Sequence, residues 1–278
     1  MGRIGQSYRV TKVTFGADPA EGYATDTRGD LVTVEEPLEL RVGGTTVTTT
    51  MRTPGHDLEL IHGFLHAEGH ITRAEQISTA RYCAGATGPN GENTYNLLEV
   101  DLSRGTRPLG RESIRLTTMT SACGVCGSTS IDEVLRRRHH HVEPVRLDPR
   151  VVVSLPEQLR AQQKQFRRTG GLHAAGAFTL TGEPIVVRED IGRHNAADKV
   201  IGHLLMNDLL PAREVILVMS SRASYELVQK AVMAGIPALV AVSAASSLAV
   251  DLAREAGLAL AGFTRENRFN LYAGELAQ

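Results

Sequence analysis

The chain has 278 residues, 42% of them hydrophobic and 22% charged, and its 30 basic and 31 acidic side chains leave a formal net charge of −1. These proportions are typical of a soluble globular protein of one or two domains. The balanced charge and the 4% aromatic content exclude a general nucleic-acid binder, which would carry a basic excess and stacking aromatics. No stretch reaches the roughly 20 apolar residues that span a bilayer, the start lacks a signal core, and three cysteines do not suit a disulfide scaffold. We therefore expect a cytoplasmic protein without a membrane segment.

The first part of the chain predicts a small α+β domain, which we place at residues 1–110. Apolar residues alternate over 38–51 on either side of Gly43 and Gly44, a pattern typical of a tight β-hairpin. The segment 57–66 then changes to helical spacing. A hairpin followed by a helix indicates one small unit.

Residues 111–150 are expected to connect this unit to the next. They contain two of the cysteines and a run of three arginines and three histidines from Arg136 to His141. Adjacent histidines on a helix point in different directions, so we interpret the run as a solvated helix end rather than a metal or anion site.

From residue 151 to the end, helical and strand-like patterns alternate. Ser154 and Glu157 form a possible capping box for a helix that reaches about Phe166. The strand-like runs are 174–179, 185–188, 215–219, 238–242 and 258–263. The helical patterns are 195–207, 224–234 and 246–256. This alternation predicts a layered α/β sheet for residues 151–278.

Cys123 and Cys126 form a CxxC motif among glycines and small hydroxyl residues. A helix that begins near Ser130 would place its positive end close to the thiols and favour the thiolate, which is the nucleophilic form. One thiolate could attack sulfur or a disulfide, and the other could resolve the product.

The residues alone leave several interpretations of the motif open. A zinc site needs four ligands, and with only Cys83 left the fourth would have to be histidine or a carboxylate. A thioredoxin-like redox pair would follow a strand in a compact domain, and a buried structural pair is disfavoured because the flanking glycines do not pack. Sulfur relay through a persulfide is open to the same thiolate. We expect Cys83 itself to be a buried small hydrophobe.

Three segments of the C-terminal part carry charged or hydroxyl groups just after predicted strands. They are 188–199, 219–226 and 262–270. In the first, His194 and Asp198 stand four apart on a helix and can pair, and Arg193 offers a place for an anion. That segment alone also fits a capped helix with surface ion pairs. Because arginine forks suit phosphate oxygens and aromatic bases, the three together predict one sheet edge that holds a nucleotide-like, multiply phosphorylated ligand.

His173 begins a segment that excludes one enzyme class. A zinc deaminase uses H-x-E followed by P-C-x-x-C, but Ala175 stands at the glutamate position and no cysteine follows. Deaminase chemistry is therefore not expected.

In their joint order, the motifs resemble the formate dehydrogenase accessory sulfurtransferase family, FdhD, over about residues 30–273. The residues that carry the resemblance are Met51-Arg52-Thr53-Pro54, Gly63-Phe64-Leu65 with Glu68-Gly69, Cys123-Gly124-Val125-Cys126-Gly127, Asp190-Ile191-Gly192-Arg193-His194-Asn195-Ala196 with Asp198-Lys199, Arg222-Ala223-Ser224-Tyr225-Glu226, and Gly262-Phe263 with Arg265. Two departures, Ser221 where glycine is expected and Ala245 where proline is expected, concern local loop shape.

This resemblance implies an α/β protein whose C-terminal layered sheet has the cytidine-deaminase-like fold without zinc, and it implies no structural metal. It also implies a sulfurtransferase, which takes sulfur from a cysteine desulfurase and passes it to the molybdenum or tungsten bis(guanine dinucleotide) cofactor that a maturing formate dehydrogenase requires. Expected partners are the desulfurase, the catalytic subunit of formate dehydrogenase and a second copy of the chain in a homodimer.

The same resemblance assigns roles to particular residues. The family's persulfide-bearing cysteine falls on Cys123, with Cys126 helping to accept or release sulfur by exchange. Its cofactor-binding stretch falls on Phe263, Thr264, Arg265, Glu266, Asn267 and Arg268.

Two other function classes stay open. In a cofactor-binding chaperone, the cysteines would only dock the donor, and a Cys123→Ala variant would still yield active formate dehydrogenase. A metal-stabilised binding module would contain stoichiometric zinc and unfold with a chelator.

Overall fold

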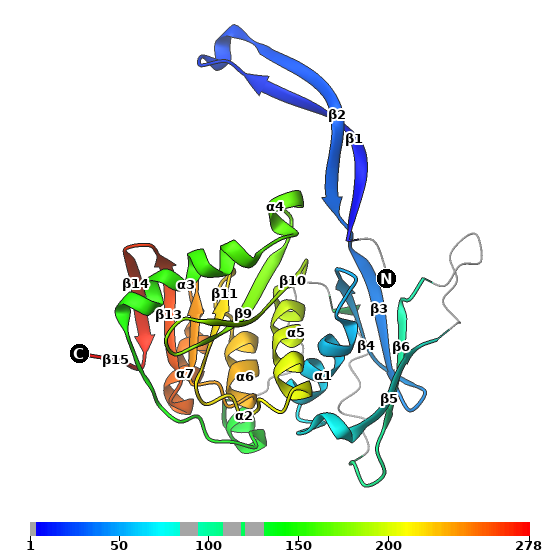
Figure 1. The fold of residues 1–278 in the computed structure, drawn as a ribbon, viewed down its shortest axis with the longest axis vertical. Helices are drawn as coiled ribbons and strands as arrows, with labels where there is room; N and C mark the ends of the chain where they lie inside the picture. The colour runs from blue at the N-terminus through cyan, green and yellow to red at the C-terminus, as the bar shows by residue number, and fades with distance from the viewer. Residues whose placement is uncertain (1–3, 84–93, 108–117, 120–130) are drawn as a thin grey trace.

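The computed structural model describes residues 4–83, 94–107, 118–119 and 131–278. Figure 1 shows three parts: a protruding hairpin, an N-terminal sheet with one helix against it, and a larger sheet flanked by helices. Within these described ranges, no helix is long and apolar enough to cross a membrane.

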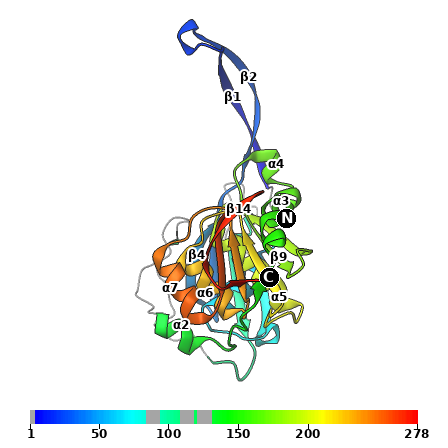
Figure 2. The same ribbon diagram turned by 90° about the vertical axis from the view of Figure 1, so that its left-hand side faces the viewer.

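The hairpin, which we call the arm, consists of β1 (Gly5–Phe15) and β2 (Tyr23–Thr33). The two strands pair antiparallel without a register shift from Gly5↔Thr33 to Phe15↔Tyr23. Figures 1 and 2 show the arm standing away from the rest of the molecule in both views. Its base is tied to the body where the Thr33 hydroxyl donates to the Thr169 hydroxyl at 2.7 Å.

The N-terminal sheet has the strand order β5-β6-β3-β4-β7. Its strands are β3 (Glu36–Val42), β4 (Thr45–Arg52), β5 (Ile77–Tyr82), β6 (Leu97–Leu102) and β7 (Thr118–Met119). Gly43 and Gly44 form the turn between β3 and β4 with φ values of 56° and 79°, which confirms the predicted hairpin. The predicted helix is also confirmed as α1 (Asp57–Ala67), and its apolar side packs against the sheet.

The larger sheet has the order β10-β9-β11-β12-β13-β14, in which β11, β12 and β13 run parallel. Its strands are β9 (His173–Thr179), β10 (Pro184–Asp190), β11 (Val215–Met219), β12 (Ala238–Ala241), β13 (Ala259–Arg265) and β14 (Arg268–Ala273). Its helices include α5 (Arg193–Met206), α6 (Tyr225–Met233) and α7 (Ser247–Ala256). The five predicted strands and three predicted helices are confirmed here, whereas β14 was not predicted.

Alternate side chains of this sheet build two separate cores, as the pleat requires. Ala175, Leu217 and Leu239 pack with α5, α6 and α7 on one face. Phe178 and Ile216 pack with α3 (Pro149–Gln162) on the other. The result is a three-layered α/β arrangement, which confirms the predicted fold class; the deaminase-like type remains a prediction.

Helix α3 begins earlier than the sequence predicted. Asp148 is its N-cap and accepts the amide N–H of Arg150 at 2.8 Å, and Pro149 occupies the first turn, where its missing N–H costs nothing. The predicted capping box is wrong, because the Ser154 hydroxyl donates to the carbonyl of Val151 inside the helix.

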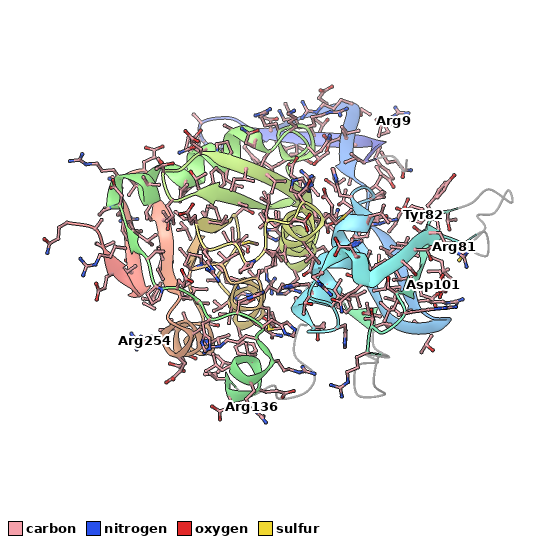
Figure 3. The ribbon with its side chains drawn as sticks, turned by 60° about the horizontal axis from the view of Figure 1, so that its bottom comes forward. Arg9, Arg81, Tyr82, Asp101, Arg136 and Arg254 are labelled. Carbon is pink, nitrogen blue, oxygen red and sulfur yellow. The ribbon has the colours of Figure 1, made fainter. Side chains whose placement is uncertain are left out.

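The remaining elements are small. They are α2 (Ile131–Arg137), α4 (Phe166–Thr169), the single-turn helices η1 (Pro19–Glu21) and η2 (Ala74–Gln76), and a parallel pair of short strands, β8 (Arg146–Leu147) and β15 (Glu275–Leu276). The run of arginines and histidines from Arg136 to His141, which begins at the end of α2, is a solvated helix end, as predicted. Arg137 pairs with Glu133, and Arg136 points outward (Figure 3).

Helices α1 and α5 join the two sheets by a close crossing. A Cβ on Gly63 would lie 1.9 Å from the carbonyl oxygen of Asp198, and one on Gly202 would lie 1.8 Å from that of Glu59. Only glycine permits this approach. The N-terminal sheet and the C-terminal layers therefore share a tight interface, and the domain limits at residues 110 and 150 stay a prediction.

Candidate functional site

A cavity of about 930 Å³ opens at the edge of the larger sheet where β11, β12 and β13 end. The carboxyl ends of parallel strands meet at one edge, which is where ligands commonly bind in α/β proteins. Ser220 and Val242 follow two of these strands and line the cavity. Its size lies within the range of small-molecule and cofactor sites.

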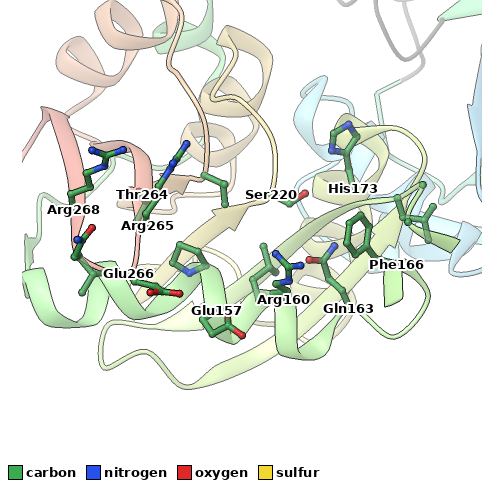
Figure 4. A pocket seen from close by; sticks show the side chains of 18 of the residues that line it. Glu157, Arg160, Gln163, Phe166, His173, Ser220, Thr264, Arg265, Glu266 and Arg268 are labelled. Atoms are coloured by element: carbon green, nitrogen blue, oxygen red, sulfur yellow. The ribbon is translucent and has the colours of Figure 1, made fainter. Parts of the chain in front are cut away.

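The turn between β13 and β14 forms one end of the cavity. All of its polar residues line the wall: Thr264, Arg265, Glu266, Asn267 and Arg268. Figure 4 labels four of them, Thr264, Arg265, Glu266 and Arg268. The turn is tight because Arg265 pairs with Arg268 across the two strands. Five of the six predicted cofactor-binding residues are thus gathered in one place.

Phe263, the sixth, does not line the cavity. It adopts a positive φ of 51° at a register shift in the β13–β14 pairing, and its ring is 41% exposed. The backbone amide of Phe263 donates to the carbonyl of Ser243, which holds the bulge in place.

Thr264 carries a buried hydroxyl that has no hydrogen-bond partner among the described residues. A buried polar group without a partner costs about 1–3 kcal/mol. Because Thr264 also lines the cavity, this hydroxyl is available to a ligand there.

Helix α3 supplies the long wall of the cavity, and this was missed in the sequence analysis. Glu157, Arg160 and Gln163 face the cavity at intervals of three residues, and Phe166 of α4 closes the wall near His173 (Figure 4). Spacing of this kind is also typical of a solvated helix face, so the sequence alone carries no signal that separates the two.

The wall is mixed in charge with an excess of arginine. Arg160, Arg265 and Arg268 line the cavity, against the carboxylates of Glu157 and Glu266. This arrangement suits a ligand with both phosphate oxygens and N–H groups, because guanidinium groups bind phosphate and carboxylates accept from amides.

At the other end, His173 is half-buried. Burial lowers the pKa of its imidazole, and the neighbouring Arg193 and His194 lower it further. His173 is therefore expected to be neutral near pH 7 and able to donate or accept a hydrogen bond at the cavity wall.

The segment 188–199 contains a buried hydrogen-bond network, and its Ile191 lines the cavity. Asp190 is fully buried and accepts from Lys199 at 2.6 Å, from the amides of Thr53 and Gly192 at 3.2 and 2.8 Å, and from Asn195 at 3.1 Å. Lys199 also donates to the carbonyl of Thr53 at 3.0 Å. This network joins β10 and α5 to the end of β4.

The predicted pair between His194 and Asp198 is wrong, because each binds across to α6 instead. Asp198 accepts from Lys230 at 2.6 Å, and the Nε2 atom of His194 lies 3.8 Å from Glu226. Burial raises the pKa of Asp198, and the Lys230 ammonium opposes that rise. Hydrogen bonding from His194 lowers the pKa of Glu226 to about 2.

The CxxC motif lies outside the described residues. The described chain stops at β7, where Met119 pairs with Thr50 of β4, and resumes at α2. Cys83, a free thiol just past β5, is half-buried rather than buried as predicted, and its amide donates to the carbonyl of Leu97 at 3.1 Å. Among the described residues, no three His, Cys, Asp or Glu side chains are grouped so that they could hold a metal ion.

The chain is similar in sequence to known proteins over nearly its full length. It is 59% identical over 279 residues to the sulfur carrier protein FdhD of Corynebacterium efficiens, covering 99% of this chain and 100% of the relative. It is 53% identical to the sulfur carrier protein FdhD of Nocardia farcinica, covering 98% and 94%.

A solved structure shares the fold. The crystal structure of a protein described as a formate dehydrogenase accessory protein from Desulfotalea psychrophila matches with a TM-score of 0.70 at 22% identity, over 96% of this chain and 97% of the other. The sequence model of the FdhD/NarQ family matches residues 33–277. The predicted family is thereby confirmed, and the chain belongs to the FdhD/NarQ family.

Proposed function

We propose that this protein is a sulfur carrier in the maturation of formate dehydrogenase. It accepts sulfur from a cysteine desulfurase as a persulfide on Cys123 and passes it to a molybdenum or tungsten bis(guanine dinucleotide) cofactor. Family membership over residues 33–277 and the sulfur carrier names of its relatives support the general role. The observation that carries the cofactor part is the cavity lined by Thr264, Arg265 and Arg268.

The first step is a thiolate attack on sulfur. The Cys123 thiolate attacks the outer sulfur of the donor's persulfide, a new S–S bond forms on Cys123, and the old S–S bond breaks. The donor cysteine leaves as a thiolate, so the exchange needs no external oxidant or reductant.

Release of the sulfur uses the second cysteine. Once the cofactor is bound to receive the sulfur, the Cys126 thiolate attacks the inner sulfur of the Cys123 persulfide, the outer sulfur leaves as hydrosulfide to the cofactor, and a disulfide joins the two cysteines. A dithiol reductant then restores both thiols, which closes the cycle.

The cavity would hold the guanine dinucleotide part of the cofactor, which is the substrate of the reaction. Arg265, Arg268 and Arg160 would bind its phosphate oxygens, and the Thr264 hydroxyl would donate to an acceptor of the ligand. Glu157 and Glu266 can accept N–H groups of a guanine base. These residues orient the cofactor, and the catalytic subunit of formate dehydrogenase would then receive it.

Intact-mass spectrometry tests the carrier. Wild type, Cys123→Ala, Cys126→Ala and the control Cys83→Ala are incubated with a cysteine desulfurase and cysteine. We expect a gain of one sulfur, removable by a reductant, in every form except Cys123→Ala. If no form gains sulfur and Cys123→Ala still supports formate dehydrogenase, the protein is a cofactor chaperone instead.

A further inference from the structure

The cavity is charged at one end and uncharged at the other, as Figure 4 shows. The charged end holds Glu157, Arg160 and the arginines and glutamate of the β13–β14 turn. Within the described part of the chain, the uncharged end is lined by Gln163, by Phe166 with the two glycines after α4, and by His173, whose imidazole is neutral near pH 7 because burial lowers its pKa. Phosphate groups suit the first end, whereas the second suits a neutral ring.

Gln163 places an unused amide at the uncharged end. The residue is only 5% exposed and lines the cavity. Its backbone N–H donates to the carbonyl of Arg160 at 3.1 Å, but its side-chain amide has no hydrogen-bond partner among the described residues. A side-chain amide offers N–H donors and a carbonyl acceptor side by side. It therefore matches a ring edge on which a C=O stands next to an N–H, which is the edge of a lactam.

Phe166 adds an aromatic face at the same end. It is half-buried, and it is the one phenylalanine or tyrosine among the described residues that line the cavity. Aromatic side chains stack on planar heterocycles of any kind, because every such ring has a π-face. Gln163 can thus bind the edge of a ring while Phe166 binds its face.

The aromatic face is held in place by contacts within the protein. The carboxylate of Glu189 on β10 accepts the amide N–H of Gln165 at 2.9 Å and that of Phe166 at 2.7 Å. At the other end of α4, the Thr169 hydroxyl accepts from Thr33 at 2.7 Å. A helix of four residues is not stable by itself, so these anchors fix the position of Phe166. A wall that is already ordered loses little conformational entropy when a ligand binds.

We propose that the uncharged end of the cavity is a second ring subsite, which binds a planar heterocycle with a lactam edge, of the pterin class, while the charged end binds the guanine nucleotide. The inference rests on the proposed function, because a dinucleotide carries one ring on each side of its pyrophosphate.

The order of side chains along α3 fits such a ligand. Glu157, Arg160 and Gln163 stand at intervals of three residues, so each lies roughly 4.5 Å farther along the helix axis than the one before. A carboxylate, a guanidinium and an amide therefore follow one another in the order in which a base, a phosphate and a second ring follow one another in a dinucleotide.

Two probes, neopterin and GDP, test whether the two ends bind separately. The chain contains no tryptophan, so neopterin fluorescence can be followed without tryptophan emission from the protein. We expect the full-length protein to quench neopterin fluorescence by stacking, and we expect saturating GDP to leave the dissociation constant for neopterin within about twofold. Displacement of neopterin by GDP would show a single ring site and overturn the proposal.

Variants at the two ends provide matched controls for each other. Gln163→Met removes the donor and the acceptor, and Phe166→Leu removes the aromatic face. Each is expected to raise the dissociation constant for neopterin about tenfold and to leave that for GDP within about twofold. Phe166→Tyr keeps the ring and is expected to bind neopterin as wild type does. Arg265→Ala with Arg268→Ala, at the charged end, is expected to weaken GDP binding alone.

The outcomes separate this proposal from the proposed function. If GDP binds but neopterin does not bind at millimolar concentration, the second subsite is wrong and the proposed function stands. If neither probe binds, the cofactor part of the proposed function falls as well. If Gln163→Met and Phe166→Leu weaken GDP binding instead, the uncharged end is the guanine site and the proposal is overturned.

Discussion

Two groups of charged residues near the ends of strands behave in opposite ways in this protein. Asp190 and Lys199, at the β10–α5 junction, are buried and satisfied by one another and by the backbone. Arg265 and Arg268, at the β13–β14 turn, are exposed and line a cavity that also contains the Thr264 hydroxyl, for which the described part of the chain offers no hydrogen-bond partner. The comparison shows that a charged residue after a strand indicates a ligand site only where the fold does not already pair that charge with another group of the protein.

The largest expected loss of unfolding free energy comes from removing the lysine of the buried Asp190–Lys199 ion pair. Lys199→Met leaves the fully buried Asp190 carboxylate without its cation, and removal of one partner from a buried pair costs about 3–5 kcal/mol. Urea unfolding at pH 7 measures the loss. Arg265→Ala, from the other group, is the control and is expected to lie within about 0.5 kcal/mol of wild type. If Lys199→Met lowered the unfolding free energy no more than Arg265→Ala, the ion pair between Lys199 and Asp190 would not stabilise the fold.

A second test measures how the unfolding free energy falls as the pH is lowered. Burial, with His139, His140 and Lys230 nearby, lowers the pKa of His66 from its ordinary 6.5 to about 4, so the folded protein keeps this imidazole neutral while the unfolded chain protonates it. Stability is then fully present above pH 6.5 and falls as the pH drops toward 4, by about 3 kcal/mol. His66→Met is expected to remove this part of the acid loss, measured as unfolding free energies at pH 7 and pH 4.5.

The control for acid is His141→Gln, which removes an exposed imidazole of the same region. It is expected to keep the wild-type loss between the two pH values. If His66→Met and His141→Gln lose stability equally, the acid sensitivity comes from groups other than His66.

The exposed group is tested by ligand binding rather than stability. Arg265→Ala with Arg268→Ala removes two charge-assisted contacts and is expected to weaken binding of GDP, used as a probe, by about a hundredfold. Sulfur uptake on Cys123 and the unfolding free energy are expected to stay unchanged. Calorimetry measures the binding, and wild-type affinity in the double variant would remove these arginines from the proposed cofactor site.

Much of the C-terminal fold could be predicted because its patterns are long and regular. Helices α5, α6 and α7 show clear apolar periodicity, and the buried strands between them are short apolar runs. The arm could not be predicted, because threonines and charges on β1 and β2 hide the alternation that marks a half-buried strand. The partners of His194 and Asp198 were also hidden, since Glu226 and Lys230 lie on another helix about 30 residues away.

The smallest expected effect is that of Thr264→Val. It tests the comparison most directly, because replacing one hydroxyl is expected to change ligand affinity and unfolding free energy in opposite directions. Thr264→Val replaces a buried hydroxyl that has no partner within the described ranges with a methyl group of similar shape. Since an unsatisfied polar group costs about 1–3 kcal/mol, the variant is expected to unfold at equal or higher urea concentration than wild type. Loss of a neutral hydrogen bond to the ligand, worth about 1 kcal/mol, is expected to weaken GDP binding several-fold.

Ser220→Ala is the control at the same wall. The Ser220 hydroxyl already accepts the amide N–H of Ala174 at 2.9 Å, so its removal is expected to lower stability instead. Lower stability of Thr264→Val with unchanged GDP binding would mean that this hydroxyl serves the fold, and that the cavity end at β13–β14 resembles the buried network rather than contrasting with it.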